Sequence, residues 1–237
     1  MTEKHRPRVA VCLPTFDHVH TGFAMSLAML CSAPHARLTL INHRSSLIHK
    51  ARDLLIVEAL KTDPDYILFL DSDLKFPAWT LGRLLSLEKD IVGAAYVNRT
   101  PPHHLMVKPL PGVEQQVVNG GCIEVASIPT GCLLIKADVF KRIGRPYFKS
   151  PSFGPNDLTP RYLQDYLPDD MRPITVGEDV DFCARARNAG VSIWFDAELT
   201  ADIGHIGEHV FQPVTHESEE AAIAAPANEA NAIAFAR

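Results

Sequence analysis

The sequence lacks the excess of positive charge that nucleic-acid-binding proteins carry. It contains 23 lysines and arginines against 28 aspartates and glutamates, which gives a net charge of −5 over 237 residues. Lys and Arg form no run along the chain, so we expect no nucleic-acid partner and at most a local basic groove. Hydrophobic residues make up 46% and charged residues 22% of the chain, and this balance excludes an intrinsically disordered protein.

Cysteine is scarce, and long apolar runs are absent. The five cysteines are Cys12, Cys31, Cys122, Cys132 and Cys183. They form no CxxC pair, which excludes a zinc knuckle and a thioredoxin-like motif. The longest apolar stretch near the N-terminus covers about residues 22–33, well short of the ~20 residues that a membrane span needs. No signal-peptide pattern opens the chain, so we expect no transmembrane segment, a reducing compartment and a cytoplasmic location.

Three common signatures of nucleotide and acyl chemistry are also missing. The sequence contains no GxGxxG, no Walker A loop and no GxSxG. Without their glycine-rich loops, neither a Rossmann dinucleotide site nor a P-loop is supported. Without a nucleophile elbow, an α/β-hydrolase is not supported either.

What the sequence does contain is a regular alternation of strand and helix patterns. The strands are expected at residues 9–13, 37–41, 66–70, 91–97, 123–128, 132–135 and 191–195. The helices are expected at residues 23–31, 47–61, 77–87, 137–143 and 178–189. This order favours an α/β fold with a mainly parallel central sheet flanked by helices and a small antiparallel part late in the chain.

The helix at 47–61 is predicted to be amphipathic. Its apolar face is expected to consist of Leu47, Ala51, Leu54, Leu55 and Ala59. Arg52 lies mostly off this face. We expect a single domain over residues 1–214, followed by an acidic, Ala-rich tail over 215–237 that is either a peripheral helix or disordered.

The sharpest chemical feature is Asp71-Ser72-Asp73, which follows the apolar run at residues 67–70. In parallel sheets, ligands bind beyond the carboxyl ends of the strands. Two carboxylates forced together there repel each other, and a hard divalent cation such as Mn²⁺ or Mg²⁺ removes that repulsion and brings phosphate oxygens as further ligands. The alternative interpretation is an acidic surface turn.

Two later segments carry further candidates. Glu178 and Asp179 open the helix at 178–189, either as a general base in a cleft or as acids that stabilise the helix dipole. His205 and His209 lie between glycines after the last strand, and a neutral imidazole is a common metal ligand, although a lone histidine is more often structural.

Four stretches together resemble a glycosyltransferase of the GT-A fold, close to the large family-2-like group. They are residues 9–15, the Asp71-Ser72-Asp73 triplet as a DxD motif, residues 129–144 and residues 177–190. The last two are similar to the "TG..ll.+..vf..iG" and "GEDvdfc.R...G" segments of such enzymes and are more specific than the triplet. The resemblance covers roughly residues 8–210.

The resemblance implies a metal-dependent transfer of sugar from a nucleoside-diphosphate sugar, such as a UDP- or GDP-sugar. Asp73, with Asp71, would hold Mn²⁺ or Mg²⁺ against the diphosphate, and His205 would complete the metal site. The residues expected to contact the nucleotide sugar are Pro14, Thr15, Arg52, Asp71 and Ser72. Asp53 stands where the related pattern often has Asn after the arginine.

The resemblance also implies a catalytic base. In inverting members it is the Asp that follows Glu, here Asp179 beside Glu178, and it would take the proton of an acceptor hydroxyl on a glycan or another molecule. A retaining enzyme would not need this base. Residues 149–173 hold five prolines and several aromatic residues, which predicts a functional loop or lid. The aromatic rings there and just before it would either face a sugar acceptor or pack the loop onto the domain; they are Tyr147, Phe148, Phe153, Tyr162 and Tyr166.

Other functions compete with this interpretation. A haloacid-dehalogenase-like phosphatase also ends an apolar strand in Asp-x-Asp, with Asp71 as nucleophile, and Asp169-Asp170 could imitate its late acidic pair. That motif usually begins the domain and continues with Gly-Thr, whereas this chain has Leu74-Lys75. A GT-A-like domain that binds sugar nucleotides without transfer, and a nucleotidyltransferase, are further alternatives.

Overall fold

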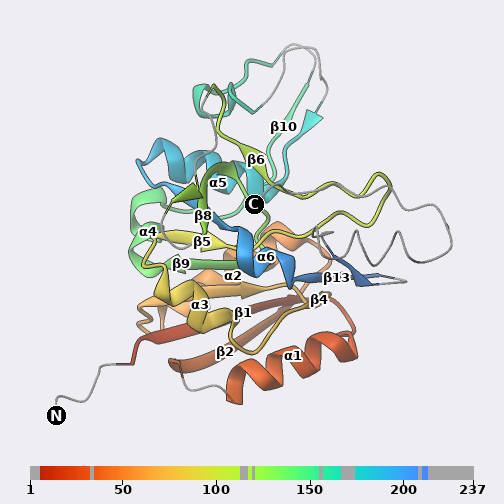
Figure 1. The fold of residues 1–237 in the computed structure, drawn as a ribbon. Coiled ribbons are helices and arrows are strands. Elements are labelled where there is room, and N and C mark those ends of the chain that lie inside the picture. The colour runs from red at the N-terminus through yellow and green to blue at the C-terminus, as the bar shows by residue number, and fades with distance from the viewer. Residues whose placement is uncertain are drawn as a thin grey trace, which may run out of the picture.

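A nine-stranded mixed sheet forms the centre of the molecule (Figure 1). The computed structural model describes residues 6–32, 35–112, 117–118, 121–154, 157–166, 174–207 and 210–212. The strand order is β2 (Arg37–Arg44), β1 (Arg8–Thr15), β3 (Tyr66–Leu70), β9 (Cys132–Lys136), β5 (Ile91–Gly93), β12 (Ile193–Asp196), β8 (Cys122–Ser127) and β6 (Lys108–Pro109), and β7 (Val117–Val118) also pairs with β8.

Seven of these nine strands point the same way, and only β8 and β9 run opposite to them. β1 pairs in parallel with β2 and β3, β12 pairs in parallel with β5, and β9 runs antiparallel between β3 and β5. β8 is antiparallel to β12. The prediction of a mainly parallel α/β sheet with a late antiparallel part is therefore confirmed.

Helices cover both faces of the sheet (Figure 1). They are α1 (Thr21–Ser32), α2 (Ile48–Leu60), α3 (Thr80–Ser86), α4 (Ala137–Ile143), α5 (Glu178–Asn188) and α6 (Ala197–Ala201). Buried residues of α2, α4 and α5 share one hydrophobic cluster, and those of α1, α3 and α6 share a second. β3 supplies Ile67 and Phe69 to the first cluster and Leu68 and Leu70 to the second, so its uninterrupted apolar run reflects burial on both faces.

Two small antiparallel sheets supplement the central one. The first joins β4 (Leu74–Lys75), β13 (Gly204–Ile206) and β14 (Val210–Phe211), and the second joins β10 (Ser152–Phe153) and β11 (Ile174–Thr175). The sequence patterns predicted none of these five short strands. The first small sheet matters most for the site, because it joins the segment after β3 to a segment about 130 residues later.

Three predicted elements differ from the structure. The strand expected at 91–97 ends at Gly93, and Val97 forms only an isolated bridge with Leu105. The helix expected at 77–87 begins at Thr80. In α2 the predicted face is wrong at two positions: Leu47 and Leu54 are 45% and 41% exposed, whereas Arg52 is only 3% exposed.

Several expectations fall outside the described residues or are limited by them. The tail at 215–237, His209 and Asp169-Asp170 lie outside them.

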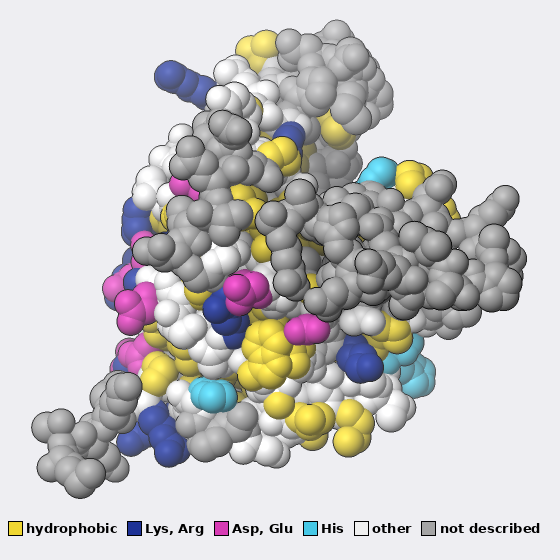
Figure 2. All heavy atoms as spheres, viewed as in Figure 1, with side chains coloured by type: hydrophobic (Ala, Val, Ile, Leu, Met, Phe, Trp, Pro, Cys, Tyr) yellow, Lys and Arg dark blue, Asp and Glu magenta, His cyan; other side chains and the backbone are white. Residues whose placement is uncertain are grey.

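Within the described part, no helix is long and apolar enough to cross a membrane. All five cysteines are free thiols. On the face drawn in Figure 2, acidic and basic side chains are interspersed rather than gathered into a patch of one sign.

Candidate active site

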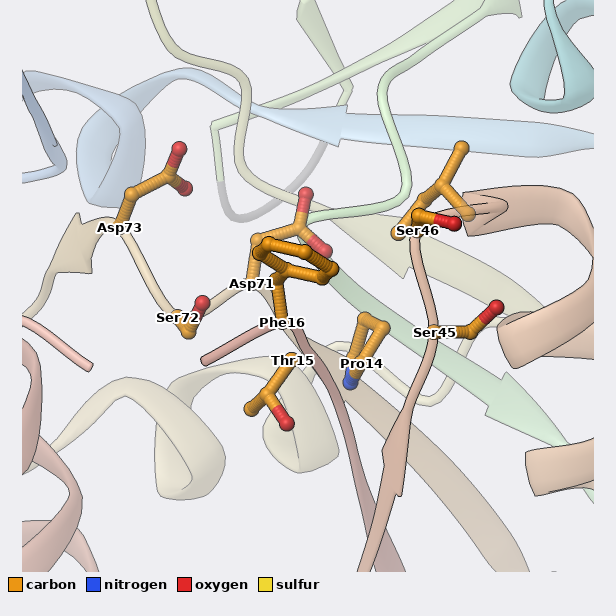
Figure 3. A pocket seen from close by; sticks show the side chains of 9 residues that line it. Pro14, Thr15, Phe16, Ser45, Ser46, Asp71, Ser72 and Asp73 are labelled. Atoms are coloured by element: carbon orange, nitrogen blue, oxygen red, sulfur yellow. The ribbon is translucent and has the colours of Figure 1, made fainter. Parts of the chain in front are cut away.

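A cleft of about 370 Å³ opens beyond the carboxyl ends of β1 and β3 (Figure 3). Three chain segments line it, and their residues are Pro14, Thr15, Phe16, Ser45, Ser46, Ile48, Asp71, Ser72 and Asp73. The parallel register of β1 with β2 and β3 brings the three strand ends to one edge of the sheet. The cleft therefore lies where the strand-end rule places a ligand.

Asp71 is fixed by the backbone of the "TG" segment. Its amide N–H donates to the carbonyl of Gly131 at 2.8 Å. A Cβ at position 131 would lie 2.6 Å from Asp71 Oδ2 and 2.5 Å from the hydroxyl of Tyr96, both too close for real atoms. Glycine is required at this position because the chain passes directly against the carboxylate.

Arg52 joins the two acidic motifs. Its Nη2 donates to both carboxylate oxygens of Asp71, at 2.8 and 2.9 Å, and its Nη1 donates to Glu178 Oε1. Only 4% of the arginine side chain is exposed, against 18% for Asp71 and 14% for Glu178. Burial opposes the charge of Arg52, but the two carboxylates outweigh it and raise the pKa of the guanidinium.

This pairing explains why α2 buries an arginine. α2 brings one cation to two partly buried carboxylates, and leaving such acids without a cation would be costly. Within the described residues, Nε of Arg52 has no hydrogen-bond partner. The resemblance implied that Arg52 contacts the nucleotide-sugar donor. In this structure its Nη groups donate to Asp71 and Glu178 instead.

His205 lies beside Asp73 because β13 pairs with β4. The register sets His205 opposite Leu74, and the amide of Ile206 donates to the carbonyl of Asp73 at 2.7 Å. His205 Nδ1 lies 2.8 Å from the carbonyl oxygen of Val97, and because a carbonyl only accepts, Nδ1 carries a proton. The other nitrogen, Nε2, lies 3.6 Å from Asp73 Oδ2.

Asp73 and His205 fit a divalent cation. With its proton on Nδ1, a neutral His205 turns an acceptor nitrogen toward an acceptor oxygen, and a cation between them resolves this conflict. Burial would raise the pKa of Asp73, but Arg99 and, when its ring is protonated, His205 outweigh it and lower the pKa. Among the described residues there is no group of three or more metal-ligating side chains, so the donor set suits a hard cation that takes its remaining ligands from phosphate and water.

Glu178 and Asp179 have different surroundings although they are adjacent. Glu178 is paired with Arg52, whereas Asp179 accepts a hydrogen bond from the amide of Val180 at 2.7 Å. Burial, and next the negative charge of Glu178, raise the pKa of Asp179. Among the described residues Asp179 forms no ion pair, and a carboxylate that binds protons more readily than usual suits a general base.

Asp181, the third acid in α5, is structural. It is fully buried and accepts hydrogen bonds from Arg185 Nε at 2.7 Å and from the Tyr162 hydroxyl at 3.0 Å. Asp53 is structural too, because it accepts from the Tyr147 amide at 2.6 Å and from Arg145 at 2.9 Å.

The aromatic residues before α5 pack onto the domain. Phe148 is buried and stacks on Phe182 with ring centroids 4.6 Å apart, and the Tyr166 hydroxyl donates to the carbonyl of Ala126 at 2.8 Å. Tyr147 lies edge-on to Phe140 at 5.4 Å. The packing interpretation of these rings therefore holds for Tyr147, Phe148 and Tyr166.

The nine predicted site residues divide into two groups. The first lines the cleft and consists of Pro14, Thr15, Asp71, Ser72 and Asp73. The second does not line the cleft: Arg52 contacts Asp71 and His205 faces Asp73, whereas Glu178 is joined to the cleft through Arg52 and Asp179 follows Glu178 in α5. The sequence did not predict that Phe16 and Ser45 line the cleft, or that Tyr96 and Arg99 contact Asp71 and Asp73. Of these, only Ser45 could have been found, because Ser45 and Ser46 are small polar residues between the end of a strand and the start of a helix.

Comparison with solved structures identifies the fold as GT-A. The chain is similar to A197 from STIV, with a TM-score of 0.55, 17% identity and coverage of 84% of this chain and 86% of that one. It is also similar to GalNAc-T7 with UDP, GalNAc and Mn²⁺, a GT-A protein, with a TM-score of 0.52 and 9% identity over 85% of this chain. This chain covers 43% of the GalNAc-T7 chain.

These likenesses confirm the GT-A fold predicted from the sequence, and at such identities they concern the fold alone. No protein-family model matches the chain, and no curated protein matches it in sequence.

Proposed function

We propose that this protein is a metal-dependent glycosyltransferase that moves a sugar from a nucleoside-diphosphate sugar to an acceptor hydroxyl, with inversion at the anomeric carbon. The observation that carries the proposal is the ion-pair chain from Asp71 through Arg52 to Glu178, which ties the DxD triplet at the cleft to the start of α5. The solved GT-A structure with UDP, GalNAc and Mn²⁺ supports the donor class.

The donor would enter the cleft with its nucleotide against Pro14 and Thr15. The N-terminal end of α2 borders the same cleft through Ser46 and Ile48, and free backbone N–H groups at a helix start favour a diphosphate. α2 has no acidic residue in its first turn, whereas α5 begins with its own acids. The start of α2 therefore suits binding of the diphosphate, whereas the acids at the start of α5 suit acceptance of a proton.

Asp73 and His205 would hold Mn²⁺ or Mg²⁺. When bound there, the ion would stabilise the negative charge that develops on the leaving diphosphate. Arg52 pairs with Asp71 and Glu178, and Asp179 forms no ion pair in the part of the chain that the structure describes.

Asp179 would act on the acceptor. Its carboxylate accepts the hydroxyl proton while the acceptor oxygen forms a bond to the anomeric carbon. On the opposite side the bond between that carbon and the phosphate oxygen breaks, and the nucleoside diphosphate leaves with the electron pair. Because one displacement occurs, the anomeric configuration inverts.

The phosphatase alternative is less well supported. A nucleophilic aspartate needs a free oxygen that can attack phosphorus, but both oxygens of Asp71 accept from Arg52. A nucleotidyltransferase would not use the acids that open α5. A GT-A domain that binds sugar nucleotides without transfer would keep the cleft and would lack only turnover.

A panel assay tests the proposal. The protein is incubated with Mn²⁺, simple sugar acceptors and a series of UDP-, GDP-, CDP- and dTDP-sugars, and the released nucleoside diphosphate is measured. We expect release from donors of one nucleotide class, and its loss in Asp73→Asn. Release of inorganic phosphate from a phosphomonoester, lost in Asp71→Asn, would favour the phosphatase instead. Binding of one diphosphate without release from any donor would favour the binding domain.

A further inference from the structure

Arg99 lies at the tip of a short hairpin that is anchored in the site. The hairpin is closed by hydrogen bonds from the Met106 amide to the Tyr96 carbonyl and from the Asn98 amide to the His104 carbonyl, both at 2.9 Å. Tyr96 at its base is buried, and its hydroxyl lies 3.4 Å from Asp71 Oδ2. The backbone of the hairpin is thus fixed relative to the DxD triplet.

The Arg99 side chain reaches from this tip to Asp73. Its Nη2 lies 3.2 Å from Asp73 Oδ2, and its Nη1 donates to the carbonyl of Ile206 at 3.2 Å. The oxygen that Arg99 contacts is the same one that faces His205 Nε2. A guanidinium therefore contacts the carboxylate oxygen at which a divalent cation would bind.

We propose that Arg99 balances the charge of Asp73 while no cation is bound, and that it moves onto the diphosphate of the donor when a divalent cation binds at Asp73 and His205. This inference rests on the proposed function. Two cations repel each other at one carboxylate oxygen, so binding of one disfavours the other. A diphosphate offers paired oxygens that match the fork of a guanidinium.

The surroundings of Arg99 allow this exchange. Its side chain is 46% exposed, and the Asp73 side chain is 28% exposed, so the guanidinium leaves without passing through packed core. The Val97 carbonyl, two residues earlier, keeps its hydrogen bond to His205 Nδ1. The hairpin can therefore stay anchored while only the Arg99 side chain changes partner.

The test compares Arg99→Ala with the wild type in two binding measurements. Mn²⁺ alone is titrated and free Mn²⁺ is followed by electron paramagnetic resonance. UDP, GDP, CDP and dTDP are then titrated calorimetrically at saturating Mn²⁺. Arg142→Ala is the matched control, because it removes one positive charge whose guanidinium bonds the carbonyls of Ala189 and Gly190.

We expect Arg99→Ala to bind Mn²⁺ about two- to fivefold more tightly, the factor that a partly exposed ion pair corresponds to. We expect the same variant to bind its diphosphate roughly tenfold or more weakly with Mn²⁺ present, because a charge-assisted hydrogen bond is lost. Arg142→Ala should change neither. A general loss of structure would weaken the binding of both Mn²⁺ and diphosphate. Tighter Mn²⁺ binding together with weaker diphosphate binding therefore distinguishes the proposed role of Arg99 from such a loss.

Mn²⁺ affinity that is unchanged or lower in Arg99→Ala would overturn the competition at Asp73. Tighter Mn²⁺ binding with undiminished diphosphate affinity would overturn the transfer of Arg99 to the donor. If the variants differ in Mn²⁺ affinity as expected but the wild type binds none of the four diphosphates, the proposed function fails while the competition stands.

Discussion

Asp179 is the side chain that takes the acceptor proton in the proposed chemistry. Its pKa is raised above the ordinary 3.8 by burial and by Glu178, so its ionised form is less stable in the folded protein than in the unfolded chain. The stability that Asp179 contributes is present below pH 3.8 and is lost as the pH rises through the raised value. At neutral pH the ionised residue therefore lowers the free energy of unfolding.

Asp179→Asn should separate activity from stability. We expect kcat to fall by about 10² to 10⁴, because a general base contributes a factor of that size. We expect the free energy of unfolding at pH 7 to rise, with the difference from wild type shrinking as the pH falls toward 3.8. Steady-state kinetics and urea unfolding at several pH values measure both. A variant that keeps full kcat would remove Asp179 from the mechanism.

Replacing Arg52 should lower the stability instead, because Arg52 pairs with two partly buried acids. Arg52→Met leaves Asp71 and Glu178 without a cation, and we expect the free energy of unfolding to fall by about 3–5 kcal/mol. Lys61→Met is the matched control: its ammonium pairs with Glu58 on an exposed surface, and its loss should cost no more than about 0.5 kcal/mol. Urea denaturation compares the two. Equal costs would mean that the Arg52 bridge is not a stabilising element.

The segment before β9 positions the DxD triplet through one glycine. Gly131→Ala places a Cβ 2.6 Å from Asp71 Oδ2, so the strand end or the carboxylate must move. We expect a loss of about 1–3 kcal/mol, as for other overpacked sites, together with weaker diphosphate binding. Thermal unfolding and calorimetry test both effects.

Gly22→Ala serves as the comparison, because its Cβ meets only the end of the Ile206 side chain at 3.3 Å. The replacement also favours the helical conformation that α1 already has. It should leave diphosphate binding unchanged. A similar loss of binding in both variants would mean that the close contact at Gly131 has no special role.

The long elements could be predicted from the sequence, and the short ones could not. β3 is a run of five apolar residues and α4 has an N-terminal acid and a glycine after its last turn, so both were placed with their correct bounds. β4 and β13 have two and three residues, too few for a period to appear. His205 reaches Asp73 only through the pairing of these two strands, which local sequence does not encode.

The burial of Arg52 was missed for a related reason. A helical pattern ranks side chains by hydrophobicity, and it placed Arg52 off the apolar face. The partners that make its burial favourable, Asp71 and Glu178, lie 19 and 126 residues away in sequence. Single-sequence patterns therefore locate candidate acids well, and they do not reveal the cations that hold them.

The fold gathers basic side chains at the cleft although the chain as a whole is acidic. The chain has a net charge of −5, yet Arg52, Arg99 and His205 all converge on the carboxylates beside the cleft. The GT-A arrangement brings them together from α2, from the hairpin after β5 and from β13. A site for a doubly charged cation and a diphosphate is thus compatible with an acidic protein.

Thermal unfolding with UDP, GDP, CDP and dTDP, each with and without Mn²⁺, is the decisive test for a metal-dependent nucleotide site beside the DxD triplet. A ligand at about 100 times its dissociation constant adds about 2.7 kcal/mol of stability, which moves the melting temperature by several degrees. We expect a shift from one diphosphate class that requires Mn²⁺ and disappears in Asp73→Ala. A shift that persists without Mn²⁺ and in Asp73→Ala, or no shift from any of the four, would contradict this expectation.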